Sequence, residues 1–251
     1  MAVVRSKDRR GARRGRTGRH LVFYSGGQER RNALIHEELI DLALGPSSDR
    51  SSRRPLRMTY VPFCSEGSAP YFSRFQRRYG AFGATDFDCL PFDDPALRED
   101  RLDAQRRIFD SDVVYLAGGN TYYFLKHMRR SGLMPTLRRF ADRGGVLAGL
   151  SAGALLLTPN IGLAGYPPFD RDENEVGLRN ESALGLVGFE FFPHYRRSPK
   201  LRDALARYSR RSGRPLYACP DGSGLLVEGD RFTAHGEVWL FANGQFCRLG
   251  A

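Results

Sequence analysis

The stretch GGVLAGLSAGALLL, residues 144–157, decides the fold. Residues 145–149 are an apolar strand candidate, Ser151 follows almost at once, and the run after it is compatible with a helix. The segment contains Gly-Leu-Ser-Ala-Gly, a G-x-S-x-G motif that is weak alone but typical of a nucleophile elbow in this strand-turn-helix context. An ordinary strand-to-helix turn would also explain the small residues. It would not explain a strand that ends in serine. We therefore predict that Ser151 is a nucleophile.

The chain on the N-terminal side of this motif repeats the same strand-loop-helix pattern. The predicted strands are residues 21–24, 57–63, 86–92, 112–116 and 145–149, and the predicted helices are residues 29–44, 69–79, 94–109, 121–130 and 134–143. Strands that alternate with helices in this way form a parallel sheet with helices on both faces. The expected fold class is therefore α/β.

The pattern changes on the C-terminal side. Residues 159–183 are rich in Gly, Pro and charge and predict a long surface excursion, which in a compact domain is usually functional or mobile. An apolar run at 184–192 and a basic helix at 199–211 follow. Five short strands then end the chain, at residues 216–218, 224–228, 231–233, 237–241 and 246–249. Their Gly-Asp, His-Gly and Asn-Gly turns predict antiparallel hairpins at the sheet edge.

The charge of the chain is concentrated at its N-terminus. The formal net charge is +11, but residues 1–20 hold eight Lys/Arg and one Asp, which leaves only +4 for the rest. We expect residues 1–20 to be a disordered basic tail and residues 21–251 to be a single domain. The tail is either a solvated extension or an arm for polyanions, and no nucleic-acid-binding motif is found elsewhere. The sequence has no membrane span or secretory signal, so a cytoplasmic protein is expected.

A nucleophilic serine needs a base, and the chain has five histidines. His20 lies in the tail. His36 and His127 lie within predicted helices among charged neighbours, and His235 lies in a glycine turn, so surface positions are expected for all three. His194 differs, because it ends an apolar run in the turn FFPHY. We predict that His194 is the general base, with a structural histidine as the alternative.

The acid that orients this histidine is predicted from its place after a strand. Asp221 follows the apolar LYA segment within Cys-Pro-Asp-Gly, although a plain Pro-Asp-Gly turn would look the same. Glu190 and Glu228 are the other acidic candidates. The order Ser, His, acid differs from that of the α/β-hydrolases, which run Ser, acid, His.

An oxyanion needs backbone N–H groups close to the nucleophile. Ala152 supplies one, because it would lie at the N-terminus of the helix after Ser151. Gly119 supplies a second, because Gly118-Gly119-Asn120 follows a predicted strand and glycine lets the backbone approach a ligand closely. The alternative is a turn that only caps the next helix.

Four segments in order resemble the peptidase E family: AGGNTYYFL, GLSAGA, FFPHY and PDGSGL. The similarity runs from about residue 20 to the C-terminus. It implies serine hydrolases on a glutamine-amidotransferase-like, flavodoxin-like fold, a family that includes aspartyl dipeptidases and the related cyanophycinases. It also implies that Ser151 is the nucleophile, His194 the base, and Gly119 and Ala152 the oxyanion-hole amides. Asp221 stands where the enterobacterial enzymes carry Glu.

The resemblance is weaker where the substrate would bind. The loop that helps to hold the substrate aspartate in the Asp-X dipeptidases reads Tyr-Arg-Arg-Ser-Pro-Lys here, at residues 195–200. Arg196, Arg197 or Arg202 would supply a cation for a carboxylate, or would form a solvated helix face. Asn120 and Arg196 are the candidate substrate-binding residues.

We expect a metal-free serine dipeptidase without a cofactor, a monomer or homodimer, that prefers peptides with N-terminal Asp. The alternatives are a cyanophycinase-like hydrolase of β-aspartyl-arginine polymer, and a catalytically inactive scaffold that binds polyanions through residues 1–20. The four cysteines, Cys64, Cys89, Cys219 and Cys247, have neither disulfide nor zinc spacing, and buried thiols are expected.

Overall fold

A computed structural model describes residues 18–27, 29–45 and 55–249 of the chain. Most of the predicted basic tail, residues 1–17, lies outside the described residues. The predicted tail boundary at residue 20 is wrong, because His20 is buried and is the first residue of strand β1. Arg19 is placed as well, with its Nε donating to Asp142 Oδ1 over 2.8 Å.

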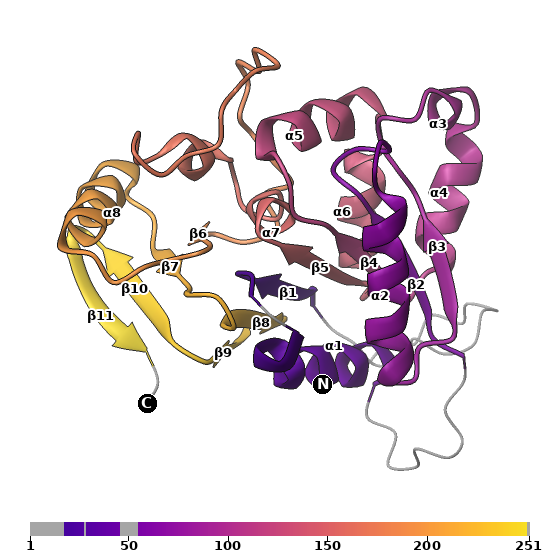
Figure 1. Cartoon of the computed structure of the whole chain (residues 1–251), viewed down its shortest axis with the longest axis horizontal. Helices are drawn as coiled ribbons and strands as arrows, with labels where there is room; N and C mark the ends of the chain where they lie inside the picture. Colours follow the sequence, from indigo (N-terminus) through magenta and orange to yellow (C-terminus); the bar gives the residue numbers. More distant parts are fainter. Residues whose placement is uncertain (1–17, 28, 46–54, 250–251) are drawn as a thin grey trace, which may run out of the picture.

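A seven-stranded sheet forms the centre of the molecule, in the order β3-β2-β4-β5-β1-β8-β9 (Figure 1). Its strands are β1 (His20–Tyr24), β2 (Arg57–Val61), β3 (Asp86–Cys89), β4 (Val113–Leu116), β5 (Val146–Leu150), β8 (Gly224–Glu228) and β9 (Arg231–His235). The first five are parallel, and β8 and β9 add an antiparallel hairpin beside β1. The predicted α/β fold with a mostly parallel sheet is confirmed.

Helices cover both faces of this sheet. The described helices are α1 (Ala33–Leu44), α2 (Ala69–Ala81), α3 (Ala96–Glu99), α4 (Arg101–Asp110), α5 (Thr121–Arg130), α6 (Met134–Asp142), α7 (Ala152–Leu155) and α8 (Pro199–Ser212), with 3-10 turns η1 (Glu29–Asn32) and η3 (Gly162–Gly165); α8 lies on the second sheet described below. Alternate residues of β1 separate the two layers: Val22 packs with α1 and α2, whereas Leu21 packs with α4 to α7. The central strands β1, β4 and β5 are buried on both faces and are almost continuously apolar, whereas the outer strands β3 and β9 carry charged residues.

The C-terminal strands form the predicted antiparallel hairpins but belong to two sheets, which corrects the prediction that they all lie at the edge of one sheet. The hairpin β8–β9 extends the central sheet, whereas β10 (Val238–Ala242), β11 (Gln245–Leu249), β7 (Leu216–Ala218) and β6 (Glu190–Phe192) form a separate sheet in the order β11-β10-β7-β6. Strand β6 pairs with β7 in parallel. Helix α8 covers this second sheet at one end of the molecule (Figure 1). The chain between the two sheets passes through the loop that contains Asp221.

Local chemistry explains where the observed elements differ from the predicted ones. Strand β2 ends before Pro62, and β3 ends before Pro91, because proline cannot donate a ladder hydrogen bond. The helix predicted over 94–109 is divided at Asp100, whose Oδ1 accepts from Asp103 N over 2.9 Å and caps α4.

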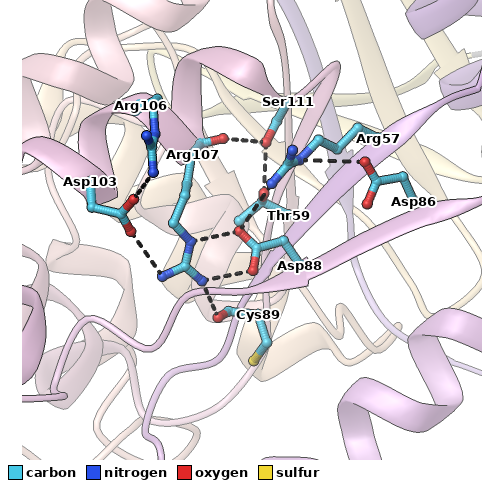
Figure 2. Close-up of polar contacts among 9 residues, drawn as sticks. All are labelled: Arg57, Thr59, Asp86, Asp88, Cys89, Asp103, Arg106, Arg107 and Ser111. Atoms are coloured by element: carbon cyan, nitrogen blue, oxygen red, sulfur yellow. Dashed lines mark hydrogen bonds and ion pairs between the residues drawn. The ribbon is translucent and has the colours of Figure 1, made fainter.

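Charged side chains hold α4 on the outer strand of the central sheet. Arg107 of α4 binds Asp88 of β3 in a bidentate pair, with distances of 2.8 and 2.7 Å, and also donates to the Cys89 carbonyl over 2.8 Å. Figure 2 shows this pair next to the Thr59–Ser111 hydrogen bond, which joins β2 to the end of α4. The opposite charges of the pair attract α4 to β3, and the two parallel hydrogen bonds also fix the orientation of the helix.

Several single-residue predictions are corrected. His36 is buried rather than exposed, with Nδ1 3.0 Å from the Tyr24 hydroxyl and 3.1 Å from that of Tyr79. Burial, and then the nearby Arg78, lower the pKa of His36 to about 3. His235 is also largely covered and pairs with Glu38 over 2.9 Å.

The four cysteines are free thiols, but their burial differs. Cys219 is buried as predicted and Cys64 and Cys89 are half-buried, whereas Cys247 is exposed in β11, so the prediction fails there. Among the described residues, no helix is both long enough and apolar enough to cross a membrane.

Candidate active site

Ser151 lies in a sharp turn between β5 and α7. Its backbone is in a strained region, with φ 50° and ψ −110°, and its N–H donates to the Tyr24 carbonyl of the neighbouring strand over 2.9 Å. A Cβ at Gly153 would overlap the Leu116 carbonyl at the end of β4. The second glycine of the motif is therefore required by the close packing of α7 on the sheet. The turn leaves the Ser151 hydroxyl free to meet other groups.

His194 follows β6 and the rigid residue Pro193. Its Nε2 lies 2.8 Å from the Ser151 Oγ, within hydrogen-bonding distance. Its backbone also has a positive φ, 55°, which is uncommon for a residue other than glycine. The structure therefore brings the predicted base to the predicted nucleophile across 43 residues of chain.

Asp221 approaches the other side of the imidazole ring from the loop between β7 and β8. Its Oδ1 lies 2.6 Å from His194 Nδ1. Since the carboxylate accepts, Nδ1 carries the proton and Nε2 is left to accept from the serine hydroxyl. The result is a continuous hydrogen-bonded chain from Ser151 through His194 to Asp221.

The pairing of β6 with β7 explains why His194 and Asp221 lie together. These strands run in parallel, so the loops that follow them leave at the same edge of the second sheet. The loops are also joined directly: Cys219 N donates to the Phe192 carbonyl over 2.9 Å, and Tyr195 N donates to the Cys219 carbonyl over 3.0 Å. The Ser151 turn lies at the edge where the parallel strands of the central sheet end, which is the usual ligand site of such sheets.

The two predicted oxyanion amides lie beside Ser151. Gly118 is close enough that an added Cβ would lie 3.6 Å from Ser151 Cβ. Gly119 has φ 147°, and the Phe63 ring occupies the space where its Cβ would be, so both conformation and packing require glycine. Within the described part of the chain, the N–H groups of Gly119 and Ala152 donate to no protein acceptor.

The two predicted substrate-binding side chains have partners within the protein. Asn120 Oδ1 accepts from Tyr123 N over 2.9 Å and caps α5, and its Nδ2 donates to the Glu173 carbonyl over 2.9 Å. Arg196 is largely exposed and its Nη2 lies 3.0 Å from Asp170 Oδ2. Arg197 instead binds Glu237.

A pocket of about 300 Å³ adjoins the Asn120 turn. It is lined mainly by the segment 171–175 together with Tyr122 and Gly165, and the segment carries three carboxylates. Asp172 fixes this segment on α5, because its Oδ2 accepts from the N–H and the hydroxyl of Thr121 over 2.8 and 2.5 Å.

The other acidic candidates lie elsewhere. Glu190 is fully buried, and its Oε1 accepts from Asn160 and Arg214 rather than from His194. Burial raises its pKa, partly offset by Arg214. Glu228 is exposed at the far end of β8, opposite His20.

Sequence reasoning missed two neighbours of the site. Ser25 and Gly26 follow β1 in the short SGG loop and are not among the predicted site residues. Both lie against the residues around His194 and Asp221. The available signal was their place after a central parallel strand, at the edge where ligands bind such sheets.

Comparisons with known proteins agree with this architecture. The sequence model of peptidase family S51 matches residues 21–235. The uncharacterized peptidase Lmo0363 of Listeria monocytogenes is 36% identical over 89 residues. The match covers 36% of the present chain and 42% of the length of Lmo0363. Peptidase E of Streptomyces coelicolor is 27% identical over 190 residues, which cover 72% of each chain.

Solved structures show the same fold. The crystal structure of a peptidase from an acI-B1 actinobacterium superposes with a TM-score of 0.66, and the match covers 94% of this chain and 95% of that one. Sequence identity over this match is 16%, so the likeness concerns the fold.

Proposed function

Because the chain belongs to peptidase family S51, we propose that it is a serine peptidase that hydrolyses short peptides. The observation that carries this proposal is the hydrogen-bonded chain from Ser151 Oγ to His194 Nε2, and from His194 Nδ1 to Asp221 Oδ1. Nucleophile, base and orienting acid in this geometry define the serine-hydrolase triad on any fold.

In the first half of the proposed reaction, Ser151 Oγ attacks the peptide carbonyl while His194 Nε2 accepts its proton. Asp221 holds the imidazole through Nδ1 and stabilises the imidazolium that forms. The C–N bond then breaks, and the departing amine takes the proton from His194. An acyl-serine ester remains, and water activated by His194 hydrolyses it to release the acid and restore Ser151.

The amides of Gly119 and Ala152 are proposed to stabilise the oxyanion. Neither N–H group has an acceptor among the residues that the structure describes, and both lie next to the serine. The Phe63 ring against Gly119 keeps the first amide in place before substrate arrives, and such preorganised donors contribute most when charge develops in the transition state.

The proposed substrate is a dipeptide with N-terminal aspartate. Arg196 supports this choice, because its guanidinium lies two residues after His194 and is largely exposed. Its present partner is Asp170, and a substrate carboxylate would replace that carboxylate as the acceptor. Asn120 stays a prediction as a substrate contact, since both of its polar atoms already have partners.

A second candidate substrate is β-aspartyl-arginine polymer. The observation that favours it is the pocket next to Asn120, whose lining holds three carboxylates, Asp172, Glu173 and Glu175, against one cation, Arg171. A guanidinium group would be attracted there, whereas a substrate carboxylate would be repelled.

A dipeptide panel tests the proposal. Peptides with N-terminal Asp, Glu, Asn, Ala, Leu and Arg, and soluble β-aspartyl-arginine, are incubated with wild type and with Ser151→Ala in the presence of EDTA. We expect hydrolysis of Asp-X that Ser151→Ala lowers by several orders of magnitude. Cleavage only of the arginine compound would transfer the proposal to the second substrate. The absence of any Ser151-dependent cleavage would contradict peptidase activity on these compounds.

A further inference from the structure

Ser25 connects the two loops that carry His194 and Asp221. Its Oγ accepts a 2.7 Å hydrogen bond from His194 N and donates a 2.6 Å hydrogen bond to the Cys219 carbonyl. Its own N–H donates to the Ser223 carbonyl over 3.1 Å. These bonds join Ser25 to the backbone of His194 and to the chain on both sides of Asp221. The Ser25 side chain is fully buried.

The backbone of His194 requires such a partner. With φ at 55°, His194 occupies a sparsely populated conformation that persists only where its surroundings determine it. Its N–H points to the buried Ser25 hydroxyl, and without that oxygen the N–H would lose its acceptor. The Ser25 hydroxyl therefore fixes the imidazole through the main chain.

Gly26 completes the arrangement over the His–Asp hydrogen bond. A Cβ at this position would overlap His194 Cε1 and lie 2.6 Å from Asp221 Oδ1, so only glycine fits. The Gly26 carbonyl accepts from Gly222 N over 2.8 Å and from Asn32 Nδ2 over 3.1 Å. These bonds attach the loop after Asp221 to the end of β1.

We propose that Ser25 is a positioning residue, which, with Gly26 and Asn32, holds His194 and Asp221 in line with Ser151. This inference rests on the proposed function, because it assigns Ser25 to the same reaction. Ser25 touches no reacting atom and acts through the backbone of the base. Its loss should therefore lower kcat much more than it changes KM, because its hydrogen bonds go to His194, Cys219 and Ser223 and not to Arg196, the proposed substrate contact.

The experiment compares Ser25→Ala with a matched control, Ser209→Ala. Ser209 is also fully buried, and its Oγ likewise accepts from one backbone N–H (Gly244, 3.1 Å) and faces a carbonyl (Ala206, 2.9 Å), but it lies in α8. We expect Ser25→Ala to lower kcat by about 10- to 100-fold, the cost of a small misplacement of a catalytic group. Ser209→Ala should keep the wild-type kcat.

A second readout needs no substrate. The proton in the short hydrogen bond between His194 Nδ1 and Asp221 should give a downfield proton NMR signal in wild type and Ser209→Ala. This signal should vanish or broaden in Ser25→Ala. If Ser25→Ala does not fold, Asn32→Ala tests the same loop, with a smaller decrease in kcat and the same NMR change.

The outcomes separate the two proposals. Equal kcat values and equal NMR signals for both serine variants would overturn the positioning role while the peptidase proposal stands. A wild type that cleaves no peptide, but whose NMR signal depends on Ser25, would contradict the proposed function and keep Ser25 as the residue that holds His194.

Discussion

At the residue scale, backbone strain coincides with the candidate site. Among the described residues, the non-glycine positions with positive φ are Ser151, His194 and Asn243. Asn243 lies in the Asn-Gly turn between β10 and β11, where this conformation is ordinary. The other two are the predicted nucleophile and base. Strain held at these two positions fits a site in which geometry is fixed before the substrate binds.

Asp221→Asn tests the third member of the proposed triad. An amide in place of the carboxylate favours the wrong tautomer of His194, so kcat should decrease by about 10³- to 10⁴-fold without loss of the fold. Glu228→Gln is the control, because Glu228 is exposed at the far end of β8 and should leave kcat unchanged. Steady-state hydrolysis checks both. Near-normal activity of Asp221→Asn would mean that another group orients the histidine.

Gly119→Ala tests the oxyanion loop. The added methyl group meets the Phe63 ring and disfavours φ 147°, so the amide should move and kcat should fall by about 10²- to 10³-fold. Gly83→Ala is the matched control: its φ is 94°, but an added Cβ there meets nothing within 4 Å. Thermal unfolding of both variants separates backbone strain from the effect on catalysis. Equal kcat values in the two variants would contradict an oxyanion role for Gly119.

Sequence alone located the candidate site but not the surroundings of every side chain. His194 could be distinguished by its apolar, Pro-fixed segment. His36 was predicted at the surface because its helix neighbours are charged, and its actual partners, Tyr24 and Tyr79, come from distant parts of the chain. Ser25 was missed for the same reason. Its bonds to His194 and Cys219 span 169 and 194 residues, and no local pattern encodes them.

At the element scale, the periodicity of apolar residues was sufficient to place most helices and strands along the chain, but not to divide them among sheets. Helix α5 and strands β7 and β8 have the predicted bounds, because alternating and helical apolar patterns are local properties. The division of the helix at Asp100 was not predicted. In the sequence, an Asp that caps a helix in the middle of a helical pattern looks like an ordinary surface Asp, and only its hydrogen bond from Asp103 N distinguishes it. The assignment of strands to sheets also failed. The hairpins are encoded locally, but the strands that they pair with, β1 for β8–β9 and β7 for β10–β11, are not.

Arg107→Ala tests the attachment of α4 to β3. Loss of the bidentate pair leaves the half-buried Asp88 carboxylate without its main donors, so the free energy of unfolding should decrease by about 1–3 kcal/mol. Arg106→Ala is the control on the same helix, because Arg106 is exposed and its removal should change stability by about 0.5 kcal/mol or less. Urea unfolding measures both. Equal effects of the two substitutions would contradict a structural role for the Arg107 pair.

At the scale of the whole molecule, the candidate triad lies where the two sheets meet. Ser151 follows a strand of the central sheet, His194 follows a strand of the second sheet, and Asp221 lies on the loop that leads from the second sheet back to the central one. Correct distances among the three therefore require correct packing of both sheets. Activity should consequently be lost before or together with global unfolding.

The buried His36 predicts an acid-sensitive fold. Its pKa is lowered to about 3 in the folded chain, whereas an unfolded chain binds the proton near pH 6.5. Because the unfolded state binds more protons between these values, stability contributed by neutral His36 is present above pH 6.5 and is lost as pH falls. The slope from this group is at most about 1.4 kcal/mol per pH unit.

Urea unfolding across this pH range checks the prediction. His36→Gln should be less stable than wild type at neutral pH, because the polar contacts with Tyr24 and Tyr79 are disturbed. Its stability should then fall less steeply with acidification. Parallel curves for the two proteins would show that His36 does not carry the pH dependence.

The most direct test of the proposed triad is covalent trapping of its nucleophile, Ser151. Wild type, Ser151→Ala and His194→Ala are treated with a fluorophosphonate, and the modified peptides are identified by mass spectrometry. The proposed triad predicts one adduct, on Ser151, that forms quickly in wild type and much more slowly when His194 is replaced, because the hydroxyl then has no base. No adduct on Ser151, or equal labelling rates with and without His194, would contradict the Ser151–His194–Asp221 triad.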